Sequence, residues 1–138
     1  MYIVNVEGAI HRNGYWLLIR RSEKEEHASG TLSLVGGKCE LEGNSTNILE
    51  RTLQREVFEE VGLKVNVISY VNSSSFVTDA GVYVIDIVFL CYPDSGEPFA
   101  KSPDEVEDVH WLSTDDILSH QDLPDYLKRN IELAHQKL

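Results

Sequence analysis

The pattern of apolar and polar positions predicts a chain in which strands alternate with helices. Runs rich in β-branched and aromatic residues predict strands at 2–10, 15–20, 31–37, 64–76, 82–92 and 109–112. Asn13-Gly14 separates the first two runs and is typical of a two-residue hairpin turn, so these two strands are expected to pair antiparallel. The third run ends in Gly36-Gly37, where the freedom of the glycine backbone predicts a tight turn.

The spacing of apolar residues becomes helical in the middle of the chain. Leu49, Leu53, Val57 and Val61 recur every four residues, which predicts a helix with one apolar face. Gly62 is placed to end this helix, whereas its start has several polar candidates for a cap, namely Asn44, Ser45, Thr46 and Asn47. Residues 113–118, with Ser113 as cap, and residues 124–138 predict two further helices.

The interleaving of these elements predicts the fold class. Strands and helices that alternate along one chain favour an α+β fold with a mixed sheet covered by helices on both faces. The chain has 138 residues, which suits a single domain, 1–138, with one hydrophobic core. Exposed strand edges in such a fold are compatible with a homodimer.

The charge of the chain restricts its partners. The formal net charge is −11, from 23 acidic and 12 basic residues, which argues against nucleic acid and against anionic membrane surfaces as partners. An acidic protein can still bind a phosphorylated small molecule when a cation mediates the contact. The N-terminus lacks the features of a signal peptide, and no long apolar stretch is present, so we expect a cytoplasmic location.

Three glutamates crowd one side of the central helix. Glu56, Glu59 and Glu60 are three and four residues apart, so their charges repel one another on the helix surface. They also lie near the helix C-terminus, where the helix dipole disfavours anions. A solvated acidic face is one interpretation of this pattern. A bound Mg²⁺ is the other, because Mg²⁺ prefers carboxylate oxygens, water and phosphate as ligands.

The residues around these glutamates resemble a known family motif. Gly36-Gly37-Lys38 followed by Arg55-Glu56-Val57-Phe58-Glu59-Glu60-Val61-Gly62-Leu63 resembles the box of the Nudix hydrolases. The segment between the two parts is four residues longer than in the family consensus, and the added turn lies either in the loop or at the start of the helix. Asn47 stands at a position where the box has Glu, for which Glu40 or Glu42 is a candidate substitute.

The resemblance implies a fold, an activity and a cofactor. The fold would be an α/β/α sandwich with a central mixed sheet, in which the catalytic helix follows a Gly-Gly turn. The activity would be divalent-metal-dependent hydrolysis of the diphosphate linkage between a nucleoside diphosphate and another moiety. The cofactor would be Mg²⁺, or Mn²⁺ in its place. The partner would be a small nucleotide-type substrate, such as a nucleoside triphosphate, ADP-ribose, a nucleotide sugar or a dinucleoside polyphosphate.

The resemblance also assigns roles to individual residues. The expected catalytic residues are Arg55, Glu56 and Glu59. The expected metal ligands are Gly37, Glu56, Glu59 and Glu60, with Gly37 acting through its carbonyl oxygen. The expected substrate-binding residues are Arg21, Lys38 and Glu105, and His27 is a weaker candidate beside them.

Two other functions are compatible with the same residues. The first is a domain of this family that binds a nucleotide or nucleotide sugar without cleaving it, since a fold can outlast its chemistry. The second is a purely structural acidic domain. The loops expected to determine specificity are residues 22–30, 72–81 and 94–105. The aromatic residues Phe76, Tyr83 and Trp111 are interpreted as core residues, because aromatics in strand patterns usually pack inside, with stacking on a nucleotide base as the alternative.

Overall fold

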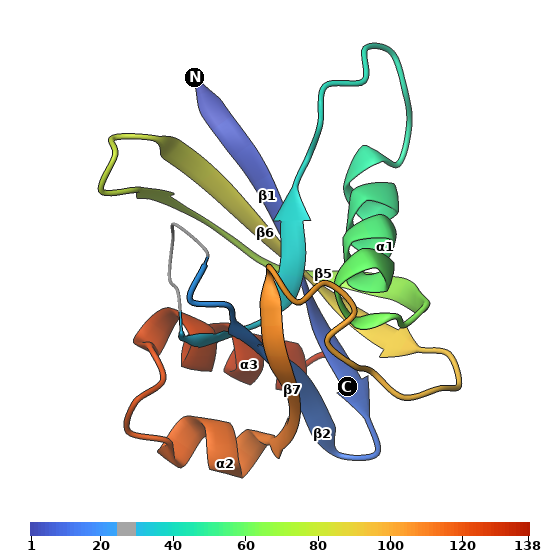
Figure 1. Ribbon diagram of the computed structural model, residues 1–138, viewed down its shortest axis with the longest axis vertical. Helices are drawn as coiled ribbons and strands as arrows, with labels where there is room; N and C mark the ends of the chain where they lie inside the picture. The colour runs from blue at the N-terminus through green and yellow to red at the C-terminus, as the bar shows by residue number, and fades with distance from the viewer. Residues whose placement is uncertain (25–29) are drawn as a thin grey trace.

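The computed structural model describes residues 1–24 and 30–138 and shows strands and helices in the predicted alternation (Figure 1). The elements are β1 (Tyr2–Arg12), β2 (Tyr15–Arg21), β3 (Leu32–Ser33), β4 (Val35–Lys38), α1 (Ile48–Val61), β5 (Val65–Val77), β6 (Tyr83–Pro93), β7 (Val106–Ser113), α2 (Thr114–Ser119) and α3 (Asp125–His135). The strand prediction at 31–37 becomes two short strands, and the prediction at 109–112 becomes the longer β7.

Strand β1 organises the sheet. It runs parallel to β6 and antiparallel to β4, and β5 extends the sheet by pairing antiparallel with β6. The turn Asn13-Gly14 has φ angles of 50° and 88°, which suit a two-residue hairpin, yet β1 pairs with β2 only at the residues flanking this turn. Beyond the turn, β2 pairs with β7 and β3 while β4 takes its place beside β1. The predicted mixed sheet is therefore confirmed.

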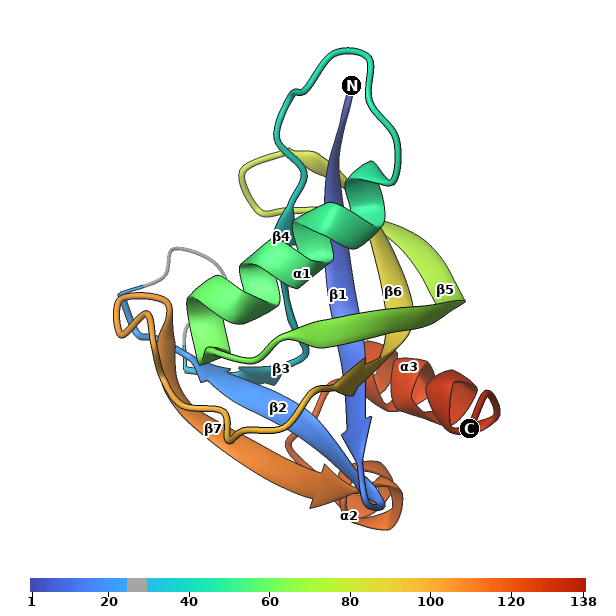
Figure 2. The ribbon, with the colours of Figure 1, turned by 90° about the vertical axis from the view of Figure 1, so that its right-hand side faces the viewer.

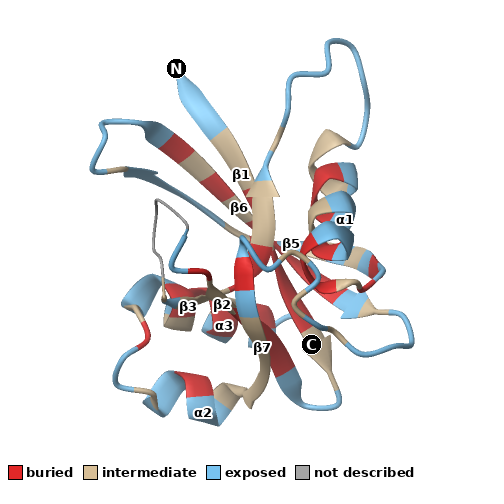
Figure 3. Ribbon diagram, viewed as in Figure 1, coloured by how far each residue is buried: buried red, intermediate tan, exposed pale blue. Residues whose placement is uncertain are grey.

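Helices cover the sheet on two sides and create two apolar clusters (Figure 2). Leu53, Val57 and Val61 of α1 pack in the first cluster, and Ile117 of α2 and Ile131 of α3 pack in the second. Buried residues accordingly alternate with exposed residues along α1, as Figure 3 shows. The α/β/α arrangement expected from the sequence is confirmed.

Only the C-terminal end of α1 has the cap that the sequence predicts. Gly62 ends the helix with a φ of 74°, and its backbone N–H donates to the carbonyl oxygen of Phe58, as predicted. At the start, Asn47 occupies the cap position in a left-handed conformation, and no side-chain cap is formed. In α2, by contrast, the side chain of Ser113 accepts a hydrogen bond from the backbone N–H of Asp116, as predicted.

The prediction of a tight turn at Gly36-Gly37 is wrong, because both glycines lie inside β4 and neither has a positive φ. The two glycines are needed because neighbouring atoms lie too close for a side chain. A Cβ atom on Gly36 would overlap the carbonyl oxygen of Val6 on β1, and a Cβ atom on Gly37 would overlap the side chain of Glu56 on α1. The glycine pair therefore lets β4 pass tightly between a neighbouring strand and the acidic face of α1.

The core interpretation of the aromatic residues is wrong at two positions. Phe76 and Tyr83 are exposed on the β5–β6 hairpin, where no helix covers them, whereas Trp111 packs against the first apolar cluster. Strand periodicity fails here because the hairpin extends beyond the helices that cover the rest of the sheet (Figure 1).

Among the residues that the structure describes, no helix is long and apolar enough to cross a membrane.

Candidate functional site

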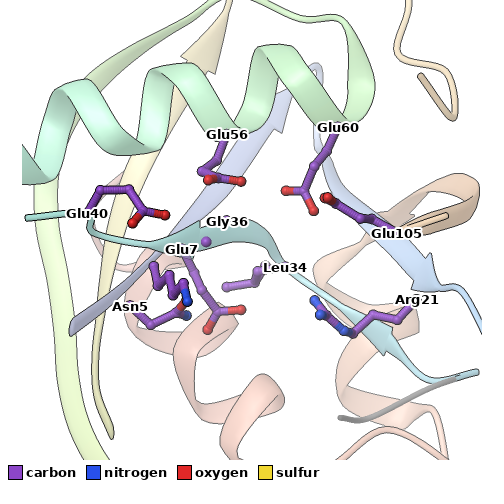
Figure 4. Close-up of a pocket in the computed structure, with 11 residues that line it drawn as sticks. Asn5, Glu7, Arg21, Leu34, Gly36, Glu40, Glu56, Glu60 and Glu105 are labelled. Carbon is purple, nitrogen blue, oxygen red and sulfur yellow. The ribbon is translucent and has the colours of Figure 1, made fainter. Parts of the chain in front are cut away.

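A cavity of about 420 Å³ lies between α1, β4, β1 and the loop before β7 (Figure 4). Its lining is mostly polar and acidic. The residues that line it are Asn5, Glu7, Arg21, Leu34, Gly36, Gly37, Lys38, Glu40, Glu56, Glu60 and Glu105. Most of the site residues expected from the sequence are therefore gathered around one cavity.

Three carboxylates converge at one end of this cavity. Glu56 and Glu60 are one helical turn apart on α1, so both point to the same side, and Glu105 approaches them from the loop before β7 (Figure 4). One oxygen from each carboxylate lies within 4.8 Å of the other two. Like charges at this spacing repel strongly, so the arrangement suits protonation or a cation.

The loop that carries Glu105 is held against the C-terminal end of α1. The backbone N–H of Phe99 donates to the carbonyl oxygen of Val61 at 3.1 Å, and that of Lys101 donates to the carbonyl oxygen of Glu60 at 3.0 Å. These bonds satisfy carbonyl groups that the helix itself leaves unpaired. The ammonium of Lys101 also lies 3.6 Å from the centre of the Phe58 ring. The fixed loop brings Glu105 to the helix carboxylates.

Glu60 is the most perturbed member of the carboxylate cluster. Only 3% of the residue is exposed, and its Oε2 atom is buried without a hydrogen-bond partner. Burial first, and then the charges of Glu56 and Glu105, raise the pKa of Glu60 to about 9. Burial also raises the pKa of Glu56. A buried carboxylate oxygen with no partner is costly, and a hard cation with oxygen ligands is the partner that would satisfy it.

Arg55 and Glu59 lie at the edge of the site. The Nη1 atom of Arg55 is 3.4 Å from Glu56 Oε1 and 3.8 Å from Glu59 Oε2, so one guanidinium serves both carboxylates. The side chain of Glu59 is 56% exposed, and it is not among the residues that line the cavity. The structure therefore places Glu59 beside Arg55 and apart from the cluster of three, and its role as a metal ligand stays a prediction.

The expected substrate-binding residues fall on the cavity wall. Arg21, at the end of β2, and Lys38, at the end of β4, are cationic groups in an otherwise acidic lining. Glu105, expected to bind substrate, lies in the carboxylate cluster, and its role in substrate binding stays a prediction. His27 lies outside the residues that the structure describes.

Glu40 and Glu42, the two candidates to replace the glutamate missing from the box, make different contacts. Glu40 lines the cavity, whereas Glu42 pairs with Arg51, whose Nη2 atom is 2.7 Å from Glu42 Oε1. The hydrogen bond with Arg51 lowers the pKa of Glu42. Residues 39–47 between β4 and α1 form an irregular loop, so Glu40 reaches the cavity from the loop and not from the helix.

A second polar group, which the sequence patterns did not predict, lies on the wall of the cavity formed by β1. Glu7 on β1 lies near Asp86 on β6, and Asn5 Nδ2 donates to Asp86 Oδ1 at 2.7 Å. Burial first, and then the neighbouring carboxyl of Asp86, raise the pKa of Glu7 well above its usual value. The available signal was a single acidic residue inside each of two mostly apolar strands.

Comparison with known proteins identifies the class of protein that this fold and site define. The NUDIX domain family matches residues 1–133, and the chain belongs to this family of hydrolases. It is 30% identical over 109 residues to the NAD-capped RNA hydrolase NudC of Escherichia coli O1:K1, which covers 79% of this chain and 38% of that protein. The chain thus spans about two fifths of the length of the curated relative that it matches.

Solved structures agree with this assignment. A MutT NUDIX hydrolase from Burkholderia pseudomallei has a TM-score of 0.81 and 28% identity, covering 96% of this chain and 98% of that one. A MutT protein from Methanosarcina mazei Go1 has a TM-score of 0.82 and 29% identity, covering 99% and 94%. The chain is therefore a member of the Nudix family by sequence and by fold.

Proposed function

We propose that this protein hydrolyses the diphosphate linkage of a nucleoside diphosphate derivative with the help of Mg²⁺, or of Mn²⁺ in its place. The observation that carries the proposal is the buried, unpartnered Oε2 atom of Glu60 within a cluster of three carboxylates. Glu56, Glu60 and Glu105 would hold the cation, and Gly37 on the adjacent β4, which also lines the cavity, would add its carbonyl oxygen. Bound there, the cation would neutralise phosphate charge and activate water.

The remaining residues supply what phosphoryl chemistry requires from a protein, which is mainly positioning and charge. Arg21 and Lys38 offer cationic groups to the substrate phosphates within a strongly acidic cavity. Glu56 lies on the cavity wall, where a proton acceptor for the attacking water must be. The guanidinium of Arg55, which is outside the residues that line the cavity, lies 3.4 Å from Glu56 Oε1 and 3.8 Å from Glu59 Oε2. Glu59 would join the reaction by turning away from Arg55.

Inorganic phosphate, released from the products by added pyrophosphatase or phosphatase, measures diphosphate cleavage and tests the proposed function. The panel would contain nucleoside triphosphates, ADP-ribose, nucleotide sugars and dinucleoside polyphosphates, each with Mg²⁺, Mn²⁺ or EDTA. NAD joins the panel because the Escherichia coli relative is named for NAD-capped RNA. We expect turnover of at least one class that EDTA abolishes. Turnover that persists in EDTA, or none on any substrate, would contradict the proposal.

Metal binding should also be visible without a substrate. A cation that binds the native carboxylate cluster but not the unfolded chain must raise the Tm by mass action. We expect millimolar Mg²⁺ to raise the Tm of the wild-type protein and to leave that of Glu56→Gln unchanged. Glu97→Gln is the matched control, because Glu97 is exposed and lies outside the cavity. An equal rise in all three proteins would show that the ion acts elsewhere.

A further inference from the structure

Exposed apolar side chains gather at the end of the sheet that extends beyond the helices (Figure 1). We call this surface the hairpin patch. Its members are each between 37% and 54% exposed, and they are Tyr2, Ile3, Phe76, Val77, Val82 and Tyr83. Single apolar residues are normal on a protein surface, but a contiguous group marks an interaction site. None of the six is among the residues that line the cavity beside α1, so the patch needs a separate explanation.

The strand pairing makes the hairpin patch continuous. Tyr2 of β1 pairs with Tyr83 of β6, and Tyr83 pairs with Val77 of β5. Register partners on adjacent strands point to the same face, so these three side chains form one apolar row, with the rings of Tyr2 and Tyr83 6.0 Å apart. Ile3 and Phe76 belong to the next row, which points to the opposite face. The end of the sheet is therefore apolar on both faces.

The segments that carry the hairpin patch contain no charged side chain. Residues 2–6, 65–78 and 80–85 include no Asp, Glu, Lys or Arg, whereas the average of the chain, 25%, predicts about six. Nucleic acids and anionic membranes are recognised through basic residues, which these segments lack. A basic protein would be attracted to the acidic residues elsewhere on the surface. The composition of the patch thus favours a partner whose own surface is apolar and uncharged.

The edge of β5 beside the hairpin patch is unprotected. Among the described residues, no strand pairs with the outer side of β5. The irregularities of β5 lie between residues 67 and 72, whereas residues 72–77 pair regularly with β6 and contain no Pro and no charge. Folded proteins protect free edges with bulges, charges or prolines, because an unprotected edge pairs with other chains. This edge therefore fits a surface that is covered in the native assembly.

A second copy of this chain meets these conditions. Two copies with a net charge of −11 each repel one another where their acidic surfaces meet, so an uncharged surface is where they can associate. A twofold axis brings the same surface of both copies together. Such a contact places like groups opposite one another, which is costly for charged residues but not for apolar ones.

The apolar area of the hairpin patch is sufficient for a dimer. A complete aromatic side chain presents roughly 150–250 Å², so the half-exposed rings of Tyr2, Phe76 and Tyr83 contribute roughly 300 Å². The aliphatic members bring this to roughly 500 Å². A typical interface buries about 800 Å² on each partner, of which about 65% is apolar in homodimers. The patch therefore supplies the apolar area that one partner needs.

We propose that this protein forms a homodimer through the hairpin patch, with Tyr83 at the centre of the interface and the unprotected edge of β5 within it. The association closes at two copies, because a twofold contact occupies the same surface on both chains. The inference is independent of the proposed hydrolysis, since the six residues of the patch lie outside the catalytic cavity.

Sedimentation equilibrium tests the oligomeric state directly. Between roughly 1 µM and 1 mM protein, we expect the wild type to reach twice the mass of one chain. Raising NaCl from about 0.05 M to about 0.5 M should lower the Kd of the dimer, because salt screens the repulsion between two acidic copies. A wild-type protein that stays monomeric throughout would overturn the proposal. A Kd that rises with salt would do the same, because it indicates contacts between opposite charges.

Lysine substitutions test whether the hairpin patch is the interface. Tyr83→Lys makes the chain less negative, so the general repulsion between copies falls and a weaker dimer reports lost contacts at the patch. We expect it to raise the Kd at least tenfold. Tyr15→Lys is the matched control, because Tyr15 is 49% exposed and lies beside the end of β1 farthest from Tyr2. Its Kd should stay within about twofold of the wild-type value.

A second variant covers the case in which Tyr83→Lys fails to fold after losing its contact with the ring of Tyr2. Val77→Lys lies in the same row and touches the same interface, so we expect the same rise in Kd. Far-UV circular dichroism and Tm would establish that each variant is folded. A folded lysine variant at either position with the wild-type Kd would overturn the proposal, and so would a larger effect of Tyr15→Lys.

Hydrogen exchange locates the interface without any substitution. At protein concentrations about tenfold above and about tenfold below the measured Kd, the dimer and the monomer dominate in turn. We expect the amides of residues 72–84 to exchange more slowly in the dimer, and those of β7 to keep their rate. Protection confined to other segments would overturn the proposal. Monomeric protein that binds phosphatidylcholine vesicles through Tyr83 would also overturn it, because the patch would then face lipid.

Discussion

Glu60→Gln is expected to lower kcat by about 10³-fold or more while leaving the fold intact. The substitution keeps the shape of the side chain but removes the charge that a cation needs, and a bound metal contributes several kcal/mol to such reactions. Glu60 also carries the buried oxygen without a hydrogen-bond partner. Steady-state kinetics with saturating Mg²⁺ would measure the loss, and Glu50→Gln, in the first turn of the same helix, is the control.

The same variant should be more stable than the wild type when metal is absent. The pKa of Glu60 is raised in the folded protein from an unfolded value of 4.5 to about 9. A raised pKa means that its contribution to stability is complete below pH 4.5 and is lost as the pH rises towards 9. Gln does not titrate, so Glu60→Gln should gain about 3 kcal/mol over the wild type at pH 7 and almost nothing at pH 4.5.

Urea unfolding in EDTA at these two pH values would measure this difference, and Mg²⁺ should reverse its sign. The wild type gains stability from the cation, whereas Glu60→Gln does not. If Glu60→Gln is less stable than the wild type in EDTA at pH 7, the carboxylate is ionised and paired in the folded protein. That outcome would contradict the assignment of Glu60 as a group that awaits a cation.

The sequence predicted the helical part of the site better than the remainder. Glu56 and Glu60 are one turn apart on a helix whose apolar face and Gly62 end are both readable, so their common direction follows from local spacing. Glu105 belongs to a distant loop, and its position depends on hydrogen bonds from Phe99 and Lys101 to the end of α1. Such contacts join residues about forty apart and leave no periodic signal.

The acid pair of Glu7 and Asp86 was not predicted for a related reason. Each residue alone is the one acidic position in a mostly apolar strand, which usually means a solvent-facing side chain. Only the parallel pairing of β1 with β6 places them side by side, and that pairing connects segments about eighty residues apart. The prediction that Phe76 and Tyr83 are buried was wrong, because both are exposed. Strand propensity does not tell whether a helix covers that part of the sheet.

Gly36→Ala is expected to destabilise the fold by about 3 kcal/mol or more. A Cβ atom at this position overlaps the backbone of Val6 and Glu7, and the two strands cannot separate without breaking their ladder between Asn5–Lys38 and Gly8–Val35. Because the overlap is with backbone atoms, no change of side-chain rotamer can relieve it. Urea unfolding would measure the loss, and Gly8→Ala, whose Cβ meets side-chain atoms no closer than 3.3 Å, should cost much less.

Gly37→Ala should lower activity with little loss of stability, in contrast to Gly36→Ala. At Gly37 the overlapping atoms belong to the side chain of Glu56, which can rotate away from β4 and leave the strand in place. That rotation would remove Glu56 from the carboxylates of Glu60 and Glu105, so Mg²⁺-dependent turnover should fall at least tenfold with little change in the urea midpoint. A Gly37→Ala variant that unfolds like Gly36→Ala would show that Glu56 is held rigidly. Full activity would show that its position is not needed.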